Sequence, residues 1–272
     1  MAEYRSTKHH RGRRTTNKKK KRDWLFIILM VLAVGVFLYS GWQLFSIGKG
    51  YLDGRSEYNE IRDIALLEDI DAEGESFKGF RVNFEELLKI NGDTIAWIKF
   101  DPEPSIINYP VVQGADNSQY LHQTFSANEN TLGAIFMDMH NDKNFNDRNT
   151  IIYGHRMKDG SMFRHLQDYD SKEFWEANQY FYIYTPDNRE LTYHIYSMGE
   201  VRDTSDTYRY EFVSDEEYAA FIQMTKQVSL YDTGITPTLD DKVVTLSTCT
   251  SASNENRFVV RGVLIKEAKL SQ

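Results

Sequence analysis

Cysteine is nearly absent from this 272-residue chain, and that scarcity excludes several classes of protein. Cys249 is the sole cysteine, so no intramolecular disulfide can form and the chain is not a disulfide scaffold. The sequence also lacks a Cys/His cluster with zinc-ligand spacing and a Gly-rich phosphate loop. Internal repeats and a Pro/Ser-rich linker are missing too. We therefore expect no cofactor and no metal.

Aromatic residues are plentiful, whereas charge is unevenly divided. Tyr and Phe number 17 and 16, so the chain can bury a substantial core and is not disordered throughout. Residues 1–22 carry ten Lys/Arg and one acid, a net charge of +9. Because the whole chain carries −8, residues 23–272 carry −17. The two parts are predicted to face different surroundings.

A long uncharged stretch follows the basic tail, from Trp24 to Gly48. Twenty-five helical residues span about 37 Å, which exceeds the bilayer core of about 30 Å. Trp24 and Trp42 lie near the two ends, where aromatic rings favour the membrane interface. A cleaved signal peptide is the alternative, but its apolar stretch is usually about 7–15 residues long. The sequence therefore favours an uncleaved anchor.

The charge pattern also predicts topology and domain organisation. Positive charge before a span keeps that side in the cytoplasm, which explains the tail better than binding to nucleic acid. Our expectation is a single-pass protein of the cell membrane, with a cytoplasmic N-terminus and an extracellular catalytic domain. Its parts are a cytoplasmic basic tail at 1–22, a transmembrane anchor at 23–46, a helical arm at 47–79 and the catalytic domain at 80–272.

Beyond the anchor, hydrophobic periodicity predicts a mainly β, α+β domain. Two amphipathic helical stretches are expected in residues 49–92. Asp170 and Ser214 each precede an acid by three residues and are predicted to cap short helices. Eight short β-type runs suggest a closed or nearly closed eight-stranded barrel: Ala96–Phe100, Ile106–Val112, Gly133–Met137, Thr150–Tyr153, Tyr180–Tyr184, Leu191–Ser197, Val243–Thr248 and Phe258–Ile265.

The lone cysteine ends one of these predicted strands. A thiol attacks as thiolate, so it needs a nearby cation or base. Arg257 stands eight residues further on, at the start of the next strand, and a hairpin would bring it opposite Cys249. Its guanidinium could favour a thiolate or stabilise an oxyanion. The alternative to a reactive thiol is that Cys249 is a small buried apolar residue, and the alternative for Arg257 is an ordinary surface arginine. Arg261, further into the strand, is a second candidate for the cation.

A histidine is the expected base, and seven are present. His155 directly follows the predicted strand 150–153 and Gly154, so it also lies at a strand end. Taken alone, a structural histidine would be the simpler interpretation, and its pairing with a strand-end cysteine reverses that preference. The others are on the cytoplasmic side or in loops, a helix and a strand: His9, His10, His122, His140, His165 and His194.

These segments resemble the sortase family. Thr245-Leu-Ser-Thr-Cys249 is similar to the sortase TLxTC signature, Tyr153-Gly-His155 to its histidine segment, and Arg257-Phe-Val-Val to the strand after the cysteine. The runs Gly133–Asp138 and Asp147–Thr150 also resemble the family, over roughly residues 80–266. The helical arm and the helix near 214–230 are most like class B sortases.

The resemblance implies a mechanism and a set of partners. A sortase binds an exported protein through a C-terminal sorting motif of the LPxTG or NPxTN kind. Cys249 would attack the Thr carbonyl and form a thioester, His155 would protonate the leaving amine, and Arg257 would hold the substrate or oxyanion. An amine on a cell-wall precursor or pilin of a Gram-positive cell would then resolve the thioester.

Other functions fit the sequence less well. A papain-type protease places its cysteine before its histidine, which is the reverse of the order here. An anchored cysteine peptidase that only hydrolyses, and a non-catalytic surface binding domain, stay as alternatives. The acidic stretch 138–147 could suggest calcium, but it lacks the central Gly and terminal Glu of an EF-hand loop. A solvated surface loop is expected there.

Overall fold

The computed structural model describes residues 17–66, 80–249 and 255–270, and two compact units divide after Lys49. Helix α1 (Asn17–Ala65) runs without a break through the predicted anchor and into the predicted arm. From Trp24 onward it is long and apolar enough to cross a membrane, with a mean hydropathy of 2.3 over its most apolar window. The predicted tail up to position 16 and the arm residues 67–79 lie outside the described residues.

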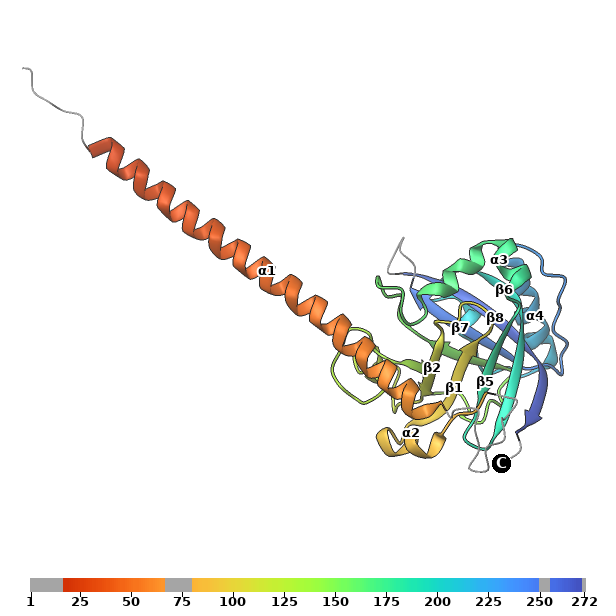
Figure 1. The fold of residues 1–272 in the computed structure, drawn as a ribbon. Coiled ribbons are helices and arrows are strands. Elements are labelled where there is room, and N and C mark those ends of the chain that lie inside the picture. Colours follow the sequence, from red (N-terminus) through yellow and green to blue (C-terminus); the bar gives the residue numbers. More distant parts are fainter. Residues whose placement is uncertain (1–16, 67–79, 250–254, 271–272) are drawn as a thin grey trace, which may run out of the picture. The chain divides into compact units, whose positions relative to one another are not determined.

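Eight strands close into a barrel, which confirms the predicted fold class (Figure 1). Their order around the barrel is β1-β2-β3-β4-β7-β8-β6-β5. Two neighbouring pairs, β2 with β3 and β4 with β7, are parallel, and the other pairs are antiparallel. The strands are β1 (Thr94–Phe100), β2 (Asn108–Val112), β3 (Ile135–Met137), β4 (Asn149–Tyr153), β5 (Tyr180–Tyr184), β6 (Arg189–Arg202), β7 (Val243–Cys249) and β8 (Asn256–Lys269).

Strands β6 and β8 are longer than the sequence predicts. Each has 14 residues, and they pair from Arg189↔Lys269 to Arg202↔Asn256. The terminal residues of both strands are mostly polar and less buried than the strand centres. These residues lack the apolar alternation by which a strand is recognised in a sequence. Pairing between the strands, rather than local pattern, extends them.

Large aromatic side chains fill the core of the barrel. Trp97, Phe100, Phe181 and Tyr193 are almost completely buried. The rings of Phe181 and Tyr193 stack with centroids 5.0 Å apart, and those of Phe100 and Phe181 lie 5.2 Å apart. Burial of a Phe-sized side chain contributes about 1.5–3 kcal/mol, so this cluster is a main source of stability.

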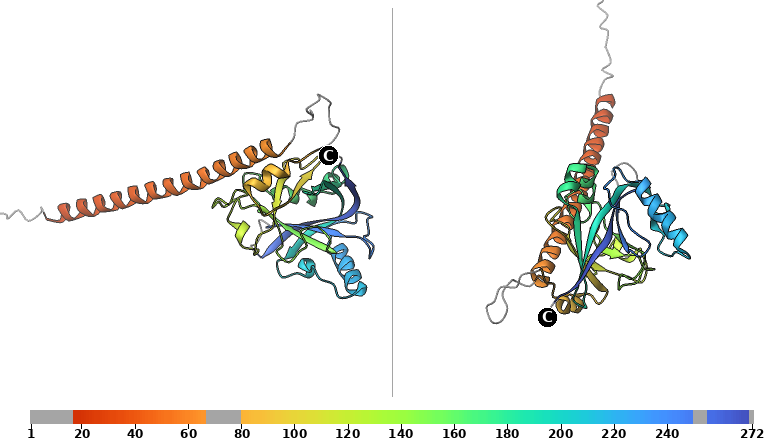
Figure 2. Two further views of the ribbon diagram at one scale, coloured as in Figure 1. Left: turned by 90° about the horizontal axis from the view of Figure 1, so that it is seen from below. Right: turned by 90° about the vertical axis from the view of Figure 1, so that its right-hand side faces the viewer.

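Short helices surround the barrel: α2 (Phe84–Ile90), η1 (Gln119–Leu121), η2 (Arg164–Asp170), α3 (Lys172–Ala177), η3 (Asp206–Tyr208) and α4 (Asp215–Gln227), seen from two further sides in Figure 2. Ser214 caps α4, as predicted, by accepting a hydrogen bond from the Glu217 N–H. The cap predicted at Asp170 is wrong. Ser171 caps α3 instead, because its hydroxyl accepts from the Phe174 N–H and η2 extends through Asp170.

The last part of α1 packs on the barrel unit through one face. Tyr58, Ile61 and Ala65 are buried. The Tyr58 hydroxyl donates to the carbonyl of Gly133 (2.7 Å) and accepts from the Phe125 N–H (3.2 Å). This helical turn therefore holds the chain segment that leads into β3.

Candidate active site

The predicted nucleophile and arginine are opposite each other in the barrel. Strands β7 and β8 are antiparallel, and their register pairs Cys249 with Arg257, which confirms the predicted hairpin. Strand β4 runs parallel to β7, with Tyr153 beside Ser247, and the Gly154 N–H donates to the Ser247 carbonyl at 3.1 Å. Parallel strands end at the same edge of a sheet, so His155 follows β4 at the edge where β7 ends. Residues 250–254 of the hairpin loop lie outside the described part of the chain.

A cavity of about 320 Å³ opens at this edge. It includes two of the three predicted site residues, His155 and Arg257, together with residues just before Cys249. The lining comes from β3, β4, β7, β8 and the connections between strands: Asn117, Leu121, Phe136, Tyr153, Gly154, His155, Asp203, Tyr208, Ser247, Thr248 and Arg257. A pocket of this size, with apolar walls and a few polar groups, can hold part of a peptide.

His155 is fixed by its neighbours. Its Nε2 atom lies 2.7 Å from the Leu121 carbonyl oxygen, and because a carbonyl only accepts, Nε2 carries a proton. Burial lowers the pKa of His155, with a smaller lowering from His122, while the Leu121 carbonyl opposes the shift. A depressed pKa favours the neutral ring near pH 7, which leaves Nδ1 free of a proton and able to accept one.

Arg257 is partly buried beside the same cavity. Its side chain is 26% exposed, and its Nη2 atom lies 3.7 Å from the Asp203 carboxylate. The alternative, Arg261, lies elsewhere: it is fully buried and donates to Ser197 Oγ at 3.0 Å and Thr207 Oγ1 at 2.8 Å. Arg261 is not among the residues that line the cavity, so the geometry favours Arg257 as the cation at this site.

Of the described histidines, His155 alone lines the cavity. His165 contacts Asp168 (2.7 Å), and the ring of His194 stacks on Tyr180 with centroids 4.6 Å apart. His122 follows η1, and His140 contacts Asp138 at 2.9 Å. His9 and His10 lie outside the described residues.

Sequence reasoning missed several residues of the cavity wall. Tyr153 and Tyr208 lie with ring centroids 6.1 Å apart, and the Tyr208 hydroxyl is 2.9 Å from Ser247 Oγ. Tyr153 could have been found, since it lies two residues before His155 on a strand that ends at the site. Tyr208 ends the short helix η3 and Asn117 lies in an irregular connection, and in neither place does a local pattern mark a residue as part of a site.

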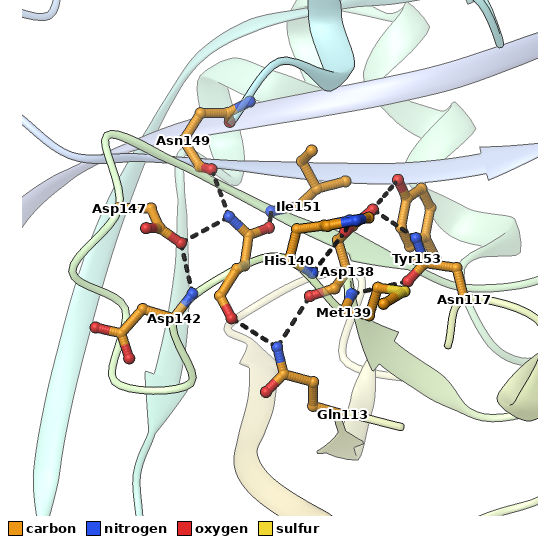
Figure 3. A network of polar contacts seen from close by, with 11 residues as sticks. Gln113, Asn117, Asp138, Met139, His140, Asp142, Asp147, Asn149, Ile151 and Tyr153 are labelled. Carbon is orange, nitrogen blue, oxygen red and sulfur yellow. Dashed lines mark hydrogen bonds and ion pairs between the residues drawn. The ribbon is translucent and has the colours of Figure 1, made fainter. Parts of the chain in front are cut away.

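The acidic stretch after β3 is a surface loop, as the sequence predicts, but its base is buried. Asp138 and Asn141 are each only 5% exposed. Asn141 donates to Asp147 (2.7 Å). Asp138 accepts from the Tyr153 hydroxyl (2.9 Å), and Figure 3 shows Asp138, Tyr153 and Asp147 in one network of polar contacts. Protein donors therefore satisfy the carboxylates of Asp138 and Asp147 at the base of the loop, whereas its other residues include five that stay exposed: Met139, His140, Lys143, Asn144 and Asn146.

Comparisons with known proteins agree with this fold. A sequence model of the sortase domain matches residues 102–265. Sortase B of Listeria monocytogenes is 32% identical over 252 residues, which cover 90% of this chain and 99% of that protein. The chain therefore belongs to the sortase family of cysteine transpeptidases.

Solved structures narrow the class. Sortase B from Bacillus anthracis in complex with AAEK1 has a TM-score of 0.70 and 34% identity, covering 81% of this chain and all of that one. A Staphylococcus aureus sortase B–substrate complex has a TM-score of 0.63 and 33% identity, covering 69% of this chain and 85% of that one. These relatives are class B sortases, and this chain resembles them in sequence and in the closed barrel.

Proposed function

We propose that this sortase cleaves a C-terminal sorting motif of the LPxTG or NPxTN kind after its Thr and transfers the acyl group to an amine. Cys249 is the nucleophile, His155 the proton carrier and Arg257 the positive group. The observation that carries the proposal is the register that pairs Cys249 with Arg257 at the edge of a cavity lined by His155. The Staphylococcus aureus relative that was solved as a substrate complex supports a substrate-binding role for this fold.

The proposed reaction has two halves. The Cys249 thiolate attacks the Thr carbonyl carbon, the C–N bond breaks, and His155 as imidazolium gives its proton to the leaving amine. An acceptor amine then attacks the thioester, the C–S bond breaks, and His155 takes up the proton. Because burial lowers the pKa of His155, only a small fraction of the enzyme is in the imidazolium form near neutral pH.

The Arg257 guanidinium supplies the charge stabilisation. An oxyanion develops on the Thr carbonyl oxygen in each half-reaction, and a cation at the same strand edge lowers the free energy of that state. Asp203, 3.7 Å from Arg257 Nη2, restrains the guanidinium on one side. The acceptor is proposed to be an amine of a peptidoglycan precursor or pilin subunit.

Peptide cleavage tests the activity. The detergent-solubilised full chain is incubated with quenched-fluorescence peptides carrying LPxTG- and NPxTN-type motifs, with and without diglycine, and mass spectrometry identifies the products. We expect cleavage after Thr, an amine-joined product, and loss of both in Cys249→Ala, His155→Ala and Arg257→Ala. His165→Ala is the matched control, because this histidine does not line the cavity. Cleavage that survives Cys249→Ala would contradict the assigned nucleophile, and products that never include diglycine would indicate hydrolysis.

We also propose the membrane topology: a cytoplasmic tail at 1–22, an anchor at 23–46, an arm at 47–79 and an extracellular catalytic domain at 80–272. The single cysteine makes the test direct. A membrane-impermeant thiol reagent added to intact cells should label Cys249. In the double variant Ser6→Cys/Cys249→Ala, labelling should require permeabilised cells. The reverse pattern would invert the topology.

A further inference from the structure

A buried carboxylate lies behind the cavity wall. Asp138 directly follows β3, is 5% exposed and does not line the cavity. Two of its hydrogen-bond donors do line it: the Tyr153 hydroxyl at 2.9 Å and Asn117 Nδ2 at 2.8 Å (Figure 3). One charged group therefore holds two wall residues that are 36 positions apart in the sequence.

The backbone around this carboxylate is fixed in turn. The Asp138 N–H donates to the Ile151 carbonyl at 2.9 Å, and Gln113 Nε2 donates to the Asp138 carbonyl at 2.9 Å. His140 donates to the carboxylate from its backbone N–H at 3.0 Å, and its ring Nδ1 lies 2.9 Å away. Asp138 is thus a rigid acceptor rather than a side chain free to follow its neighbours.

A carboxylate also determines which way its partners point. An ionised carboxylate only accepts hydrogen bonds, so the Tyr153 hydroxyl must direct its proton to Asp138 and keep its lone pairs for other donors. The Asn117 amide is oriented at both ends, because its Oδ1 accepts from the Met139 N–H at 2.8 Å. Its second Nδ2 proton is then left for another acceptor.

We propose that Asp138 is a positioning residue that fixes the orientation and the hydrogen-bond polarity of Tyr153 and Asn117 in the substrate cavity. The wall then presents an acceptor, the Tyr153 oxygen, together with a donor, the Asn117 amide. An amide group of the bound peptide offers the complementary donor and acceptor. This inference rests on the proposed function only in that the cavity is taken to bind the sorting peptide.

The variant Asp138→Asn tests the proposal with little change of shape. Tyr153 and Asn117 both donate to Oδ2 of Asp138, and the His140 N–H donates to Oδ1. The NH2 of the new amide therefore meets a donor at either position, and the substitution also removes the charge that strengthens both wall contacts. For the full chain in detergent, we expect KM for the motif peptide to rise about tenfold, with kcat within about threefold, because the lost interaction serves ground state and transition state alike. An unchanged KM in folded Asp138→Asn would overturn the proposal.

A matched control comes from the same network. Asp147 also accepts hydrogen bonds from this segment, from Asn141 Nδ2 at 2.7 Å and the Asp142 N–H at 2.6 Å, but neither donor lines the cavity. Asp147→Asn should leave KM within about twofold of the wild type, since its effect is confined to stability. A KM rise equal to that of Asp138→Asn would make the effect a general loss of loop order and would overturn the inference.

A double-mutant cycle separates positioning from indirect damage. If Asp138 acts through the Tyr153 hydroxyl, the effect of Asp138→Asn on KM should shrink in a Tyr153→Phe background, and additive effects would contradict the mechanism. Should Asp138→Asn fail to fold, Tyr153→Phe alone removes the bonded hydroxyl, and an unchanged KM overturns the proposal. Absence of cleavage by the wild type would overturn the proposed function as well, whereas failure of this inference alone leaves wild-type cleavage intact.

Discussion

The substitution Gly133→Ala tests how closely His155, the proposed proton carrier, is packed. Gly133 has a φ of +59°, and a Cβ there would lie 2.6 Å from the Tyr120 carbonyl oxygen and 2.8 Å from Cδ2 of His155. It would also lie 3.0 Å from the carbonyl oxygen of Leu121, which is the hydrogen-bond partner of His155. One added methyl group therefore presses on the ring and on the group that orients it.

Two physical costs set the expected loss of stability. A left-handed backbone at a residue other than glycine costs about 1–3 kcal/mol, and overpacking against backbone costs about 1–3 kcal/mol more. The sum, about 2–6 kcal/mol, corresponds to a fall in Tm of roughly 4–24 °C at about 2–4 °C per kcal/mol for a domain of this size. The variant should still fold at low temperature, where its activity can be measured.

A catalytic effect is expected beside the loss of stability. The contact at 2.8 Å must lengthen, which moves the imidazole, and a displacement of about 1 Å can reduce the rate about a hundredfold. Peptide cleavage below the melting transition should therefore show a kcat lowered by about ten- to a hundredfold. Gly92→Ala is the control, because its Cβ would meet nothing within 4 Å. Wild-type kcat in a destabilised Gly133→Ala would refute the argument that this close approach positions His155.

Three further outcomes are expected. Tyr58→Phe should lower the free energy of unfolding by about 1–3 kcal/mol in denaturant titrations, because it leaves a backbone carbonyl and N–H of the barrel without their partner; an unchanged midpoint would contradict this. Burial lowers the pKa of His155, so this histidine binds a proton more readily in the unfolded chain than in the folded one, and the free energy of unfolding should rise with pH from about 5 to 7. The slope of that rise should be smaller in His155→Gln. An equal slope in the variant would contradict the lowered pKa of His155. Ser171→Ala should lower the free energy of unfolding by about 0.5–2 kcal/mol, because it removes the cap of α3. Asp170→Ala should change it by less than about 0.5 kcal/mol. A larger loss in Asp170→Ala than in Ser171→Ala would indicate that Asp170 is the cap after all.

The sequence predicts most of this fold because its strands bury apolar side chains in short, regular runs. Strand Tyr180–Tyr184 has the predicted bounds, and Cys249 ends β7 opposite Arg257. The sequence favours Asp170 as the cap because Glu173 follows it by three residues, whereas no acid lies three residues after Ser171. Backbone geometry alone distinguishes the two, and it makes Ser171 the cap. Local pattern cannot decide between adjacent candidates that are both good caps.

The candidate site was predictable only in part, for a related reason. Residues that end strands are marked by the strand pattern, so His155 and Arg257 could be placed at one edge. Tyr208 reaches the cavity from the short helix η3 and Asn117 from an irregular connection. The prediction of a solvated loop at 138–147 does not distinguish the buried Asp138 from its exposed neighbours. The burial of Asp138 depends on donors distant in sequence, which become its neighbours only in the folded barrel.

The strand order carries a consequence for how the chain folds. Strand β8 comes last of the eight, yet it lies between β7 and β6 and pairs with both along its length. Until β8 has been synthesised, β6 and β7 each present an open edge, and such edges can pair with other chains. The site can therefore form only once β8 is in place, and until then the two open edges leave the chain exposed to aggregation.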